Sequence, residues 1–299
     1  MHIKTTHKAQ NGSTQSKSLI KLQPSSMRGS IRVVIDEPDA YELENEELGI
    51  GIFEPGMNLE REMDWNHLSR VLLVVAGGWL LMFIIEVIMM VPVILYLGVL
   101  AILYNPWVLI YLSLAEIGFI IPVVSYVRNR GMKLKSVGIK YMTSIKNIVF
   151  GIVIGFAMLG ANLVISYLMT FLLPGISGDE SVFVPPQGNM LGLWLALWTI
   201  VMFVAVAFSE ELIFRGFLQR RVEMYYREKG SRHYKLVALV LTSALFAAIH
   251  LDIFGLATRF VLGLFLGYIA QKQNYSIIGS TVAHGINNSV VIILAVLGF

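Results

Sequence analysis

The stretch FSEELIFRGFLQRR (Phe208–Arg221) places two carboxylates at the end of an apolar run that begins near Leu191. A charged side chain is costly in hydrocarbon, so an acid inside a membrane span suggests a functional role. On a helix, Glu211 and Arg215 are four residues apart and share a face, which predicts an ion pair. Glu210 lies about 100° round the helix from Glu211. It is therefore left free for another task.

The composition is that of a polytopic membrane protein. Of the 299 residues, 56% are hydrophobic and 14% are charged, and the mean hydropathy is strongly positive. The chain contains no Cys, which excludes disulfides, thiolate nucleophiles and Cys-type zinc sites. The net charge of +3 is explained more simply by the orientation of loops than by an anionic partner, and it does not indicate nucleic-acid binding. Any chemistry must come from carboxylate, imidazole, amide or hydroxyl groups.

Seven apolar segments are predicted to be transmembrane helices, since about 20 apolar residues cross a hydrocarbon core of about 30 Å. They lie at residues 71–100, 106–127, 147–173, 191–218, 236–253, 256–272 and 276–298. A break of the first segment at Pro92 would give eight spans. The predicted fold class is thus an all-α polytopic membrane protein, a bundle of about seven or eight helices with a polar site buried between the C-terminal helices.

Three regions are predicted along the chain. Residues 1–70 are polar and are expected to form a disordered tail, in which IRVVI at 31–35 is compatible with a lone short strand. Residues 71–146 hold the N-terminal spans and a basic loop. Residues 147–299 are expected to form the core that carries the polar site.

The charges of the loops predict the orientation in the membrane. The segments 128–146 and 218–235 are rich in Lys and Arg, whereas 174–190 carries two acids and no base. By the positive-inside rule, the two basic segments and the N-terminal tail are expected on the cytoplasmic side, with the cell membrane as the host membrane.

Several polar side chains in the predicted spans are candidates to join Glu210. His250 lies in one segment, and His284 and Asn288 lie four residues apart on one face of the last segment. Polar side chains in membrane helices almost always face the bundle interior. We therefore expect these four groups to converge on one site.

A site of this composition can hydrolyse an amide. Glu210 would accept a proton from a water molecule that His250 holds on its other side. His284 and the side-chain amide of Asn288 would donate to the oxyanion that develops on the scissile carbonyl, which is worth about 3 kcal/mol per donor. Such a mechanism needs neither a nucleophilic Ser or Cys nor a metal.

Each polar group also has a structural interpretation. An intramembrane His can bridge helices by hydrogen bonding, and the pairing of Glu211 with Arg215 is first of all an ion pair at a helix end. Glu86 and Glu116 are expected to be packing or water-linked groups, because nothing near them in the sequence completes a site. Asn287 is predicted to lie on the wrong face to act with His284.

Two pairs of glycines fit the GxxxG pattern, Gly151 with Gly155 and Gly263 with Gly267. In membrane helices, this pattern permits close approach of two backbones. We therefore expect close helix packing at both places and no chemistry.

Three motifs resemble those of the CPBP family of intramembrane glutamic proteases, also called the ABI family, which includes the type II CAAX prenyl endopeptidases. EExxxR is matched by Glu210, Glu211 and Arg215, FxxxH by Phe246 and His250, and HxxxN by His284 and Asn288. The resemblance covers residues 190–299, and more loosely the spans from 147.

The resemblance implies a metal-independent protease without a cofactor. Glu210 and His250 would activate water, and His284 and Asn288 would form the oxyanion hole. Glu211, Arg215 and Phe246 would have supporting roles. The implied partners are membrane lipid and a peptide or protein substrate, which in the prenyl endopeptidases is a prenylated CAAX sequence that loses its last three residues at a site open to the cytosol.

Other functions remain open at this stage. A leader peptide, a bacteriocin-type peptide or a membrane anchor is the expected substrate if the host does not prenylate proteins. A non-proteolytic adaptor or scaffold could keep the same fold. Two His and one carboxylate could bind a metal, although the sequence lacks HExxH. A proton-coupled transporter is disfavoured because no internal repeat is visible.

Overall fold

The structure, a computed structural model, describes residues 21–24, 31–34, 63–139, 145–172, 185–186, 188–253 and 255–297. The chain divides into two units, Met1–Ile50 and Gly51–Phe299. In the first unit, β1 (Lys21–Pro24) pairs antiparallel with β2 (Ile31–Val34). The strand predicted at 31–35 is thus present, but it is paired rather than alone. The remainder of the predicted tail up to residue 62 lies outside the described residues.

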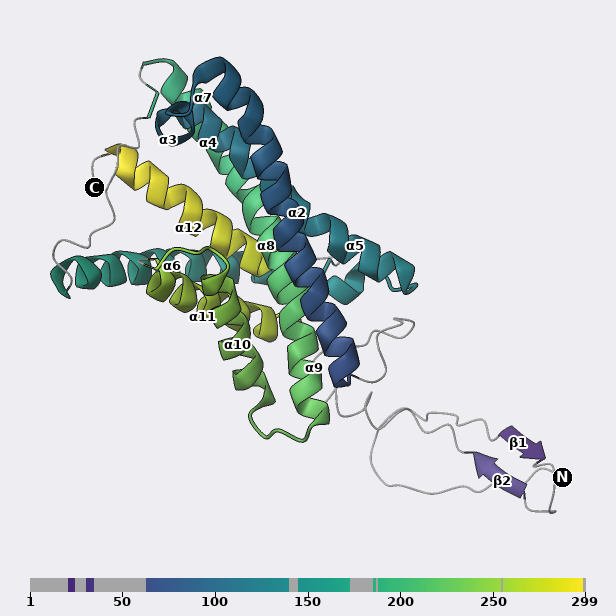
Figure 1. Ribbon diagram of the computed structural model, residues 1–299. Helices are drawn as coiled ribbons and strands as arrows, with labels where there is room; N and C mark the ends of the chain where they lie inside the picture. Colours follow the sequence, from purple (N-terminus) through teal and green to yellow (C-terminus); the bar gives the residue numbers. More distant parts are fainter. Residues whose placement is uncertain are drawn as a thin grey trace. The chain divides into compact units, whose positions relative to one another are not determined.

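The second unit is a bundle of helices (Figure 1). The N-terminal elements are α2 (Trp65–Leu97), α3 (Ala101–Tyr104), α4 (Pro106–Ser113), η1 (Leu114–Phe119), α5 (Ile120–Asn129), η2 (Leu134–Val137) and α6 (Ile145–Leu172). The C-terminal elements are α7 (Met190–Val201), η3 (Met202–Ala207), α8 (Phe208–Glu211), η4 (Leu212–Gln219), α9 (Arg220–Glu228), α10 (Tyr234–Ala248), α11 (Leu256–Lys272) and α12 (Ile277–Leu297).

Five helices of the described part are long and apolar enough to cross a membrane, by length and composition. They are Trp65–Leu97, Pro106–Asn129, Ile145–Leu172, Met190–Glu228 and Ile277–Leu297. The all-α polytopic membrane fold is therefore confirmed, and the chain is an integral multi-pass membrane protein.

Two details of the predicted spans are corrected. The segments predicted at 236–253 and 256–272 form the shorter helices α10 and α11, of 15 and 17 residues, which extend about 22 to 26 Å. Helix α2 continues through Pro92 to Leu97, so the predicted division of the first segment is not found. Its first residue, Trp65, also lies inside the region predicted as tail.

The helix Met190–Glu228 is the element around which the second unit packs. It contacts α12, α11 and α10 as well as α2 and α5, and Figure 1 shows these two groups of helices on its opposite sides. The turn α8, which carries Glu210 and Glu211, lies between two π-helical segments, η3 and η4. Such departures from regular α-helix often occur at functional sites.

Small residues let the C-terminal helices approach closely, as the GxxxG patterns predict. A Cβ atom at Gly151 of α6 would overlap the backbone carbonyl of Gly279 on α12, and one at Gly155 would lie 3.0 Å from the Ala283 carbonyl oxygen. On α11, a Cβ atom at Gly263 would lie 2.9 Å from the Cβ atom of a residue of α10. Close packing is thus confirmed at both pairs.

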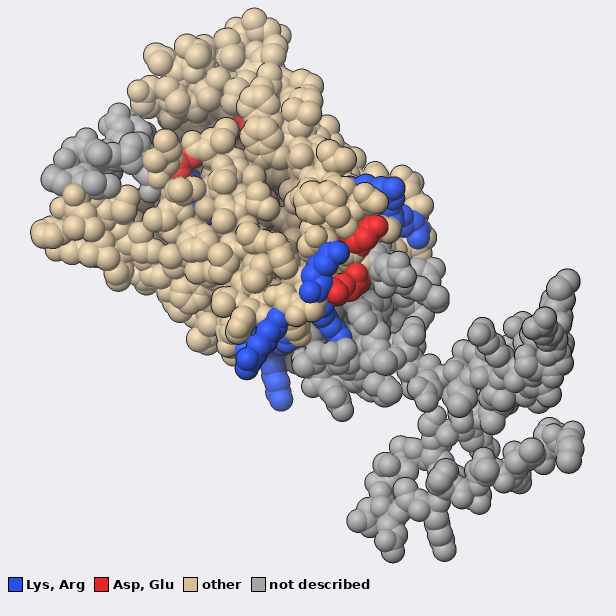
Figure 2. Space-filling model, turned by 60° about the horizontal axis from the view of Figure 1, so that its bottom comes forward, with Lys and Arg blue, Asp and Glu red and all other residues tan. Residues whose placement is uncertain are grey.

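On the face that Figure 2 shows, the described residues of the second unit are mostly uncharged. Figure 2 shows Lys and Arg side chains gathered at one end of the visible face, beyond a broad area without charge. Large apolar side chains such as Leu73, Leu95 and Val153 are exposed on the helices. This distribution is that of a protein whose middle faces lipid, with water-facing charge beyond it.

Candidate active site

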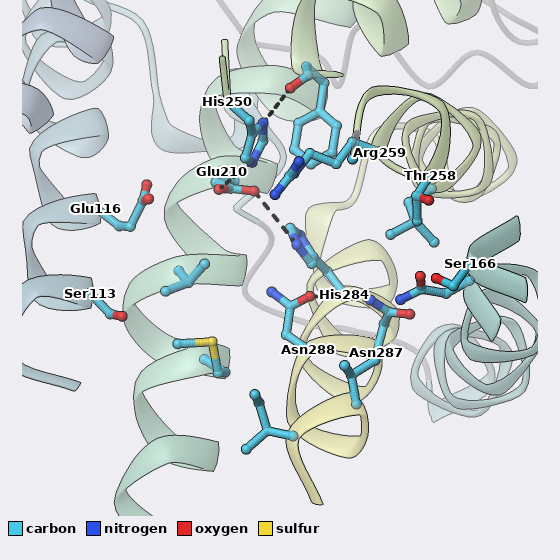
Figure 3. A pocket seen from close by; sticks show the side chains of 18 of the residues that line it. Ser113, Glu116, Ser166, Glu210, His250, Thr258, Arg259, His284, Asn287 and Asn288 are labelled. Atoms are coloured by element: carbon cyan, nitrogen blue, oxygen red, sulfur yellow. Dashed lines mark hydrogen bonds and ion pairs between the residues drawn. The ribbon is translucent and has the colours of Figure 1, made fainter. Parts of the chain in front are cut away.

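Two histidines from distant parts of the chain meet at Glu210. The Glu210 side chain is 4% exposed on α8. Its Oε1 atom lies 3.7 Å from Nε2 of His250, and its Oε2 atom lies 3.6 Å from Nε2 of His284 (Figure 3). Both distances exceed that of a direct hydrogen bond. The structure thus brings these three predicted residues together around a space that a small molecule such as water can enter.

The second glutamate of the motif binds a cation and a histidine. Oε1 of Glu211 lies 3.1 Å from Nη1 of Arg215, so the ion pair expected from the spacing is present. The same oxygen lies 3.1 Å from Nδ1 of His284. An ionised carboxylate only accepts hydrogen bonds, so this contact places a proton on Nδ1 of His284. Glu211 therefore fixes the orientation of a candidate catalytic group in addition to pairing with Arg215.

A backbone carbonyl determines the tautomer of His250. Helix α10 ends at Ala248, and Nδ1 of His250 lies 2.7 Å from the carbonyl oxygen of Phe246 in its last turn. Since a carbonyl only accepts, Nδ1 carries the proton, and Nε2 of the neutral ring is an acceptor. The acceptor atom is the one that faces Glu210.

The ring of Phe246 packs between the motif side chains. Its centroid lies 5.1 Å from that of the His250 ring and 5.9 Å from that of the His284 ring, both edge to face. The Arg215 guanidinium lies over it, 4.3 Å from the centroid. Phe246 therefore contacts one member of each motif, which gives the FxxxH phenylalanine a physical role.

A residue that the sequence did not single out fixes the turn that carries His250. The indole nitrogen of Trp79 on α2 donates a hydrogen bond of 3.1 Å to the carbonyl oxygen of Ile249. Sequence spacing gives no signal for this contact, because Trp79 lies on α2 and Ile249 directly follows α10, far along the chain. Trp79 thus connects the first span to the candidate site.

Asn288 lies in the wall of the same cavity as Glu210 and His284. Its Oδ1 atom accepts a hydrogen bond of 3.3 Å from the side-chain amide of Asn287. The amide nitrogen of Asn288 carries the donors that an oxyanion would need. Asn287, predicted to lie on the wrong face to act with His284, also lines this cavity, and no contact of its side chain with His284 is found among the described residues.

Two cavities adjoin Glu210. The larger, of about 670 Å³, contains all four predicted catalytic residues in its wall together with polar side chains of α6 and α11. Those polar side chains are Asn162, Ser166, Thr170, Thr258 and Arg259. The smaller cavity, of about 410 Å³, is mostly apolar and is lined by α2, α4 and η1. Glu210 and His250 lie in the walls of both.

The acid Glu116 also belongs to this region. It lies on η1, in the walls of both cavities, and Figure 3 shows its carboxyl group directed toward Glu210. Among the described residues, its Oε2 atom is buried without a hydrogen-bond partner. Glu86 lines the smaller cavity. Glu116 thus lies beside the candidate site, and its interpretation as a packing or water-linked group stays a prediction.

The described residues contain no group of three His, Asp or Glu side chains arranged to hold a metal ion. In particular, Glu210, His250 and His284 do not form such a group. Metal independence itself stays a prediction, for which chelation is the test.

The comparisons with known proteins agree with the motifs. Residues 192–290 match a family model described as type II CAAX prenyl endopeptidase Rce1-like, and this family is a protease family. The matched range contains every motif residue from Glu210 to Asn288. No curated protein and no solved structure matches the chain. Over residues 192–290, the chain is therefore similar to the Rce1-like family, which agrees with the resemblance of its three motifs to the CPBP family.

Proposed function

We propose that the protein is an intramembrane endopeptidase that cleaves a peptide bond with a water activated by Glu210 and His250. The observation that carries the proposal is the approach of His250 and His284 to the two carboxylate oxygens of Glu210, at 3.7 and 3.6 Å, in the wall of a cavity large enough for a peptide. The protease family matched over this region supports it.

The two acceptor atoms would orient the attacking water. Nε2 of His250 and Oε1 of Glu210 can each accept one of its O–H bonds, since Nδ1 of His250 already donates to a carbonyl. A lone pair of the water oxygen would then point into the cavity, toward the substrate. Glu210 takes one proton as this oxygen attacks the scissile carbonyl carbon.

Donors on α12 would stabilise the oxyanion that results. Nδ1 of His284 keeps its proton for the contact with Glu211, so Nε2 can donate only if it is protonated as well. The ring is then positively charged, and the carboxylate of Glu211 compensates that charge. The Asn288 amide supplies the second donor. The C–N bond then breaks, and Glu210 returns its proton to the leaving amine. The second proton of the water stays on the new carboxyl group, so the products are a carboxylic acid and an amine.

The two cavities suit a substrate with a peptide part and an apolar part. The larger cavity offers hydroxyl and amide groups to a peptide backbone. The smaller one is lined mainly by side chains such as Trp79, Phe83 and Met90 and would accommodate an isoprenoid chain. A prenylated CAAX sequence, cut before its last three residues, is therefore the proposed substrate.

The test is cleavage of a fluorogenic farnesylated CAAX peptide by purified protein in detergent with EDTA present. Wild type should cut it, whereas Glu210→Gln and His284→Ala should lose about 100-fold or more in kcat. The matched control is Glu223→Gln, which removes a buried acid of the same helix that lies outside both cavities. Full activity of folded Glu210→Gln would overturn the mechanism. A folded wild type that cuts no peptide would favour the adaptor.

A further inference from the structure

The larger cavity contains one fixed positive charge. Of the described residues that line either cavity, only Arg259 is an Arg or Lys. It lies on α11, in the same wall set as Glu210 and His250, and Figure 3 shows its guanidinium beside the His250 ring. In helical membrane proteins, a charged side chain that lines an interior cavity often marks a ligand site or a pathway.

The position of Arg259 is built by the loop that follows His250. Asp252 forms an ion pair with Nη1 of Arg259, and the other carboxylate oxygen of Asp252 accepts a hydrogen bond of 3.1 Å from the backbone N–H of Gly255. A Cβ atom at Gly255 would overlap both the guanidinium and the Asp252 carboxylate. The guanidinium is thus held close over a backbone that only glycine permits.

Part of the Arg259 side chain remains accessible, and its guanidinium has donors beyond the one used by Asp252. The Arg259 side chain is 31% exposed. The contact with Asp252 involves Nη1, whereas a guanidinium carries five N–H donors in a planar fork that matches a carboxylate. The Arg259 guanidinium is therefore suited to bind the carboxylate of a ligand in the cavity.

We propose that Arg259 binds the C-terminal carboxylate of the substrate and thereby sets the distance from the chain end to the scissile bond. The inference rests on the proposed function, since it assigns a role in selecting the bond that Glu210 cuts. One short segment carries both His250 and Arg259, so the water-binding ring and the carboxylate anchor keep a fixed separation. A substrate whose end is amidated or extended loses the contact.

Kinetics with matched peptides test the inference. Wild type, Arg259→Gln and Arg259→Lys are compared on farnesylated peptides that end in a free carboxylate, in an amide, or in three added residues. Wild type should prefer the free carboxylate about tenfold or more in kcat/KM. Arg259→Gln should cut the acid and the amide equally, and Arg259→Lys should keep part of the preference. Arg232→Gln, an exposed position outside both cavities, should behave as wild type.

A binding experiment separates this inference from the proposed function. Affinities of the acid and amide peptides are measured on Glu210→Gln with and without Arg259→Gln, so that no cleavage is needed. Tighter binding of the acid that disappears with Arg259→Gln supports the anchor even if wild type proves inactive. Equal binding of acid and amide to Glu210→Gln, or an acid preference that survives in Arg259→Gln, overturns it. A preference that follows an internal acidic side chain or is competed away by phosphate also overturns it.

Discussion

Nδ1 of His284 lies 3.1 Å from Oε1 of Glu211, so the second glutamate of the EExxxR motif holds the histidine that approaches the first. The three residues of this motif and His284 therefore form a chain of contacts, which runs from Arg215 through Glu211 and His284 to Glu210. A substitution of one of these residues is therefore expected to impair the function of the others as well.

Replacement of Glu211 by Gln should reduce both stability and activity. The Arg215 guanidinium is buried and would lose its carboxylate, which typically costs about 3 to 5 kcal/mol. His284 would also exchange a charged acceptor for the neutral carbonyl oxygen of the Gln amide, which orients its ring less strongly. Thermal unfolding and kcat on the same preparation measure the two effects.

The double variant Glu211→Gln with Arg215→Met separates these causes. Removal of the unpaired charge should recover much of the stability. The kcat should stay about tenfold or more below wild type, because the neutral Gln amide does not compensate the positive charge of a protonated His284 ring. Recovery of full activity in the double variant would show that Glu211 has only a structural role.

Helix α12 can be moved without touching a candidate catalytic side chain. Gly151→Ala on α6 places a methyl group against the backbone carbonyl of Gly279, so α12 and its His284 should shift, with a lower Tm and a lower kcat. Gly160→Ala is the control on the same helix, since a Cβ atom there meets nothing within 4 Å. It should leave the Tm unchanged or raise it. Equal effects of the two changes would contradict the packing argument.

The hydrogen bond from Trp79 to Ile249 predicts an effect on His250 from another helix. Trp79→Phe keeps an aromatic ring but removes the donor, which should cost about 1 kcal/mol in stability. The turn that carries His250 would be less well held, so kcat should fall several-fold. Phe83→Leu, which alters a stacked neighbour of Trp79 without removing a donor, is the comparison. An unchanged kcat in Trp79→Phe would show that the turn is held by other contacts.

Removal of divalent metal should leave activity intact. If the water is activated by Glu210 and His250 alone, then dialysis against EDTA or 1,10-phenanthroline changes neither kcat nor KM. Added zinc should not rescue Glu210→Gln. Loss of activity on chelation, with recovery on addition of a stated metal, would show that these side chains act through a metal.

A buried tyrosine outside the spans predicts a pH dependence of stability. Tyr275 donates a 2.5 Å hydrogen bond to Glu223, and burial, with the nearby Glu223 charge, raises the pKa of its hydroxyl well above the ordinary value of 10.0. The folded state therefore keeps the proton. Stability from this group is complete below about pH 10, the unfolded pKa, and falls as the pH rises above it. Measured from pH 8 to 11, the Tm of wild type should fall more steeply than that of Tyr275→Phe; parallel curves would contradict this.

The spacing of residues along the sequence predicted the features that depend on the geometry of a single helix. The pairing of Glu211 with Arg215, the close packing at Gly151 and the fold class all follow from local periodicity and composition, and the structure has them. The approach of His250 and His284 to Glu210 was expected because polar groups in membrane helices face inward. Their catalytic roles stay predictions.

Contacts between helices could not be predicted in the same way. Glu116 joins the cavity because η1 packs against α8, and Trp79 reaches Ile249 because α2 passes the end of α10. Neither relation leaves a periodic signal in the chain. Asn287 reaches the cavity beside Asn288, since a cavity of about 670 Å³ extends over more of α12 than one narrow face.

The proton on His250 is fixed by a peptide carbonyl and not by a side chain. Any amino acid at position 246 would present the same carbonyl acceptor. Mutation of that residue therefore changes the aromatic packing but leaves the hydrogen bond that selects the tautomer of His250. The backbone geometry at the end of α10 thus determines which nitrogen of His250 is the acceptor that faces Glu210. It would persist through sequence drift for as long as the helix stops at this point.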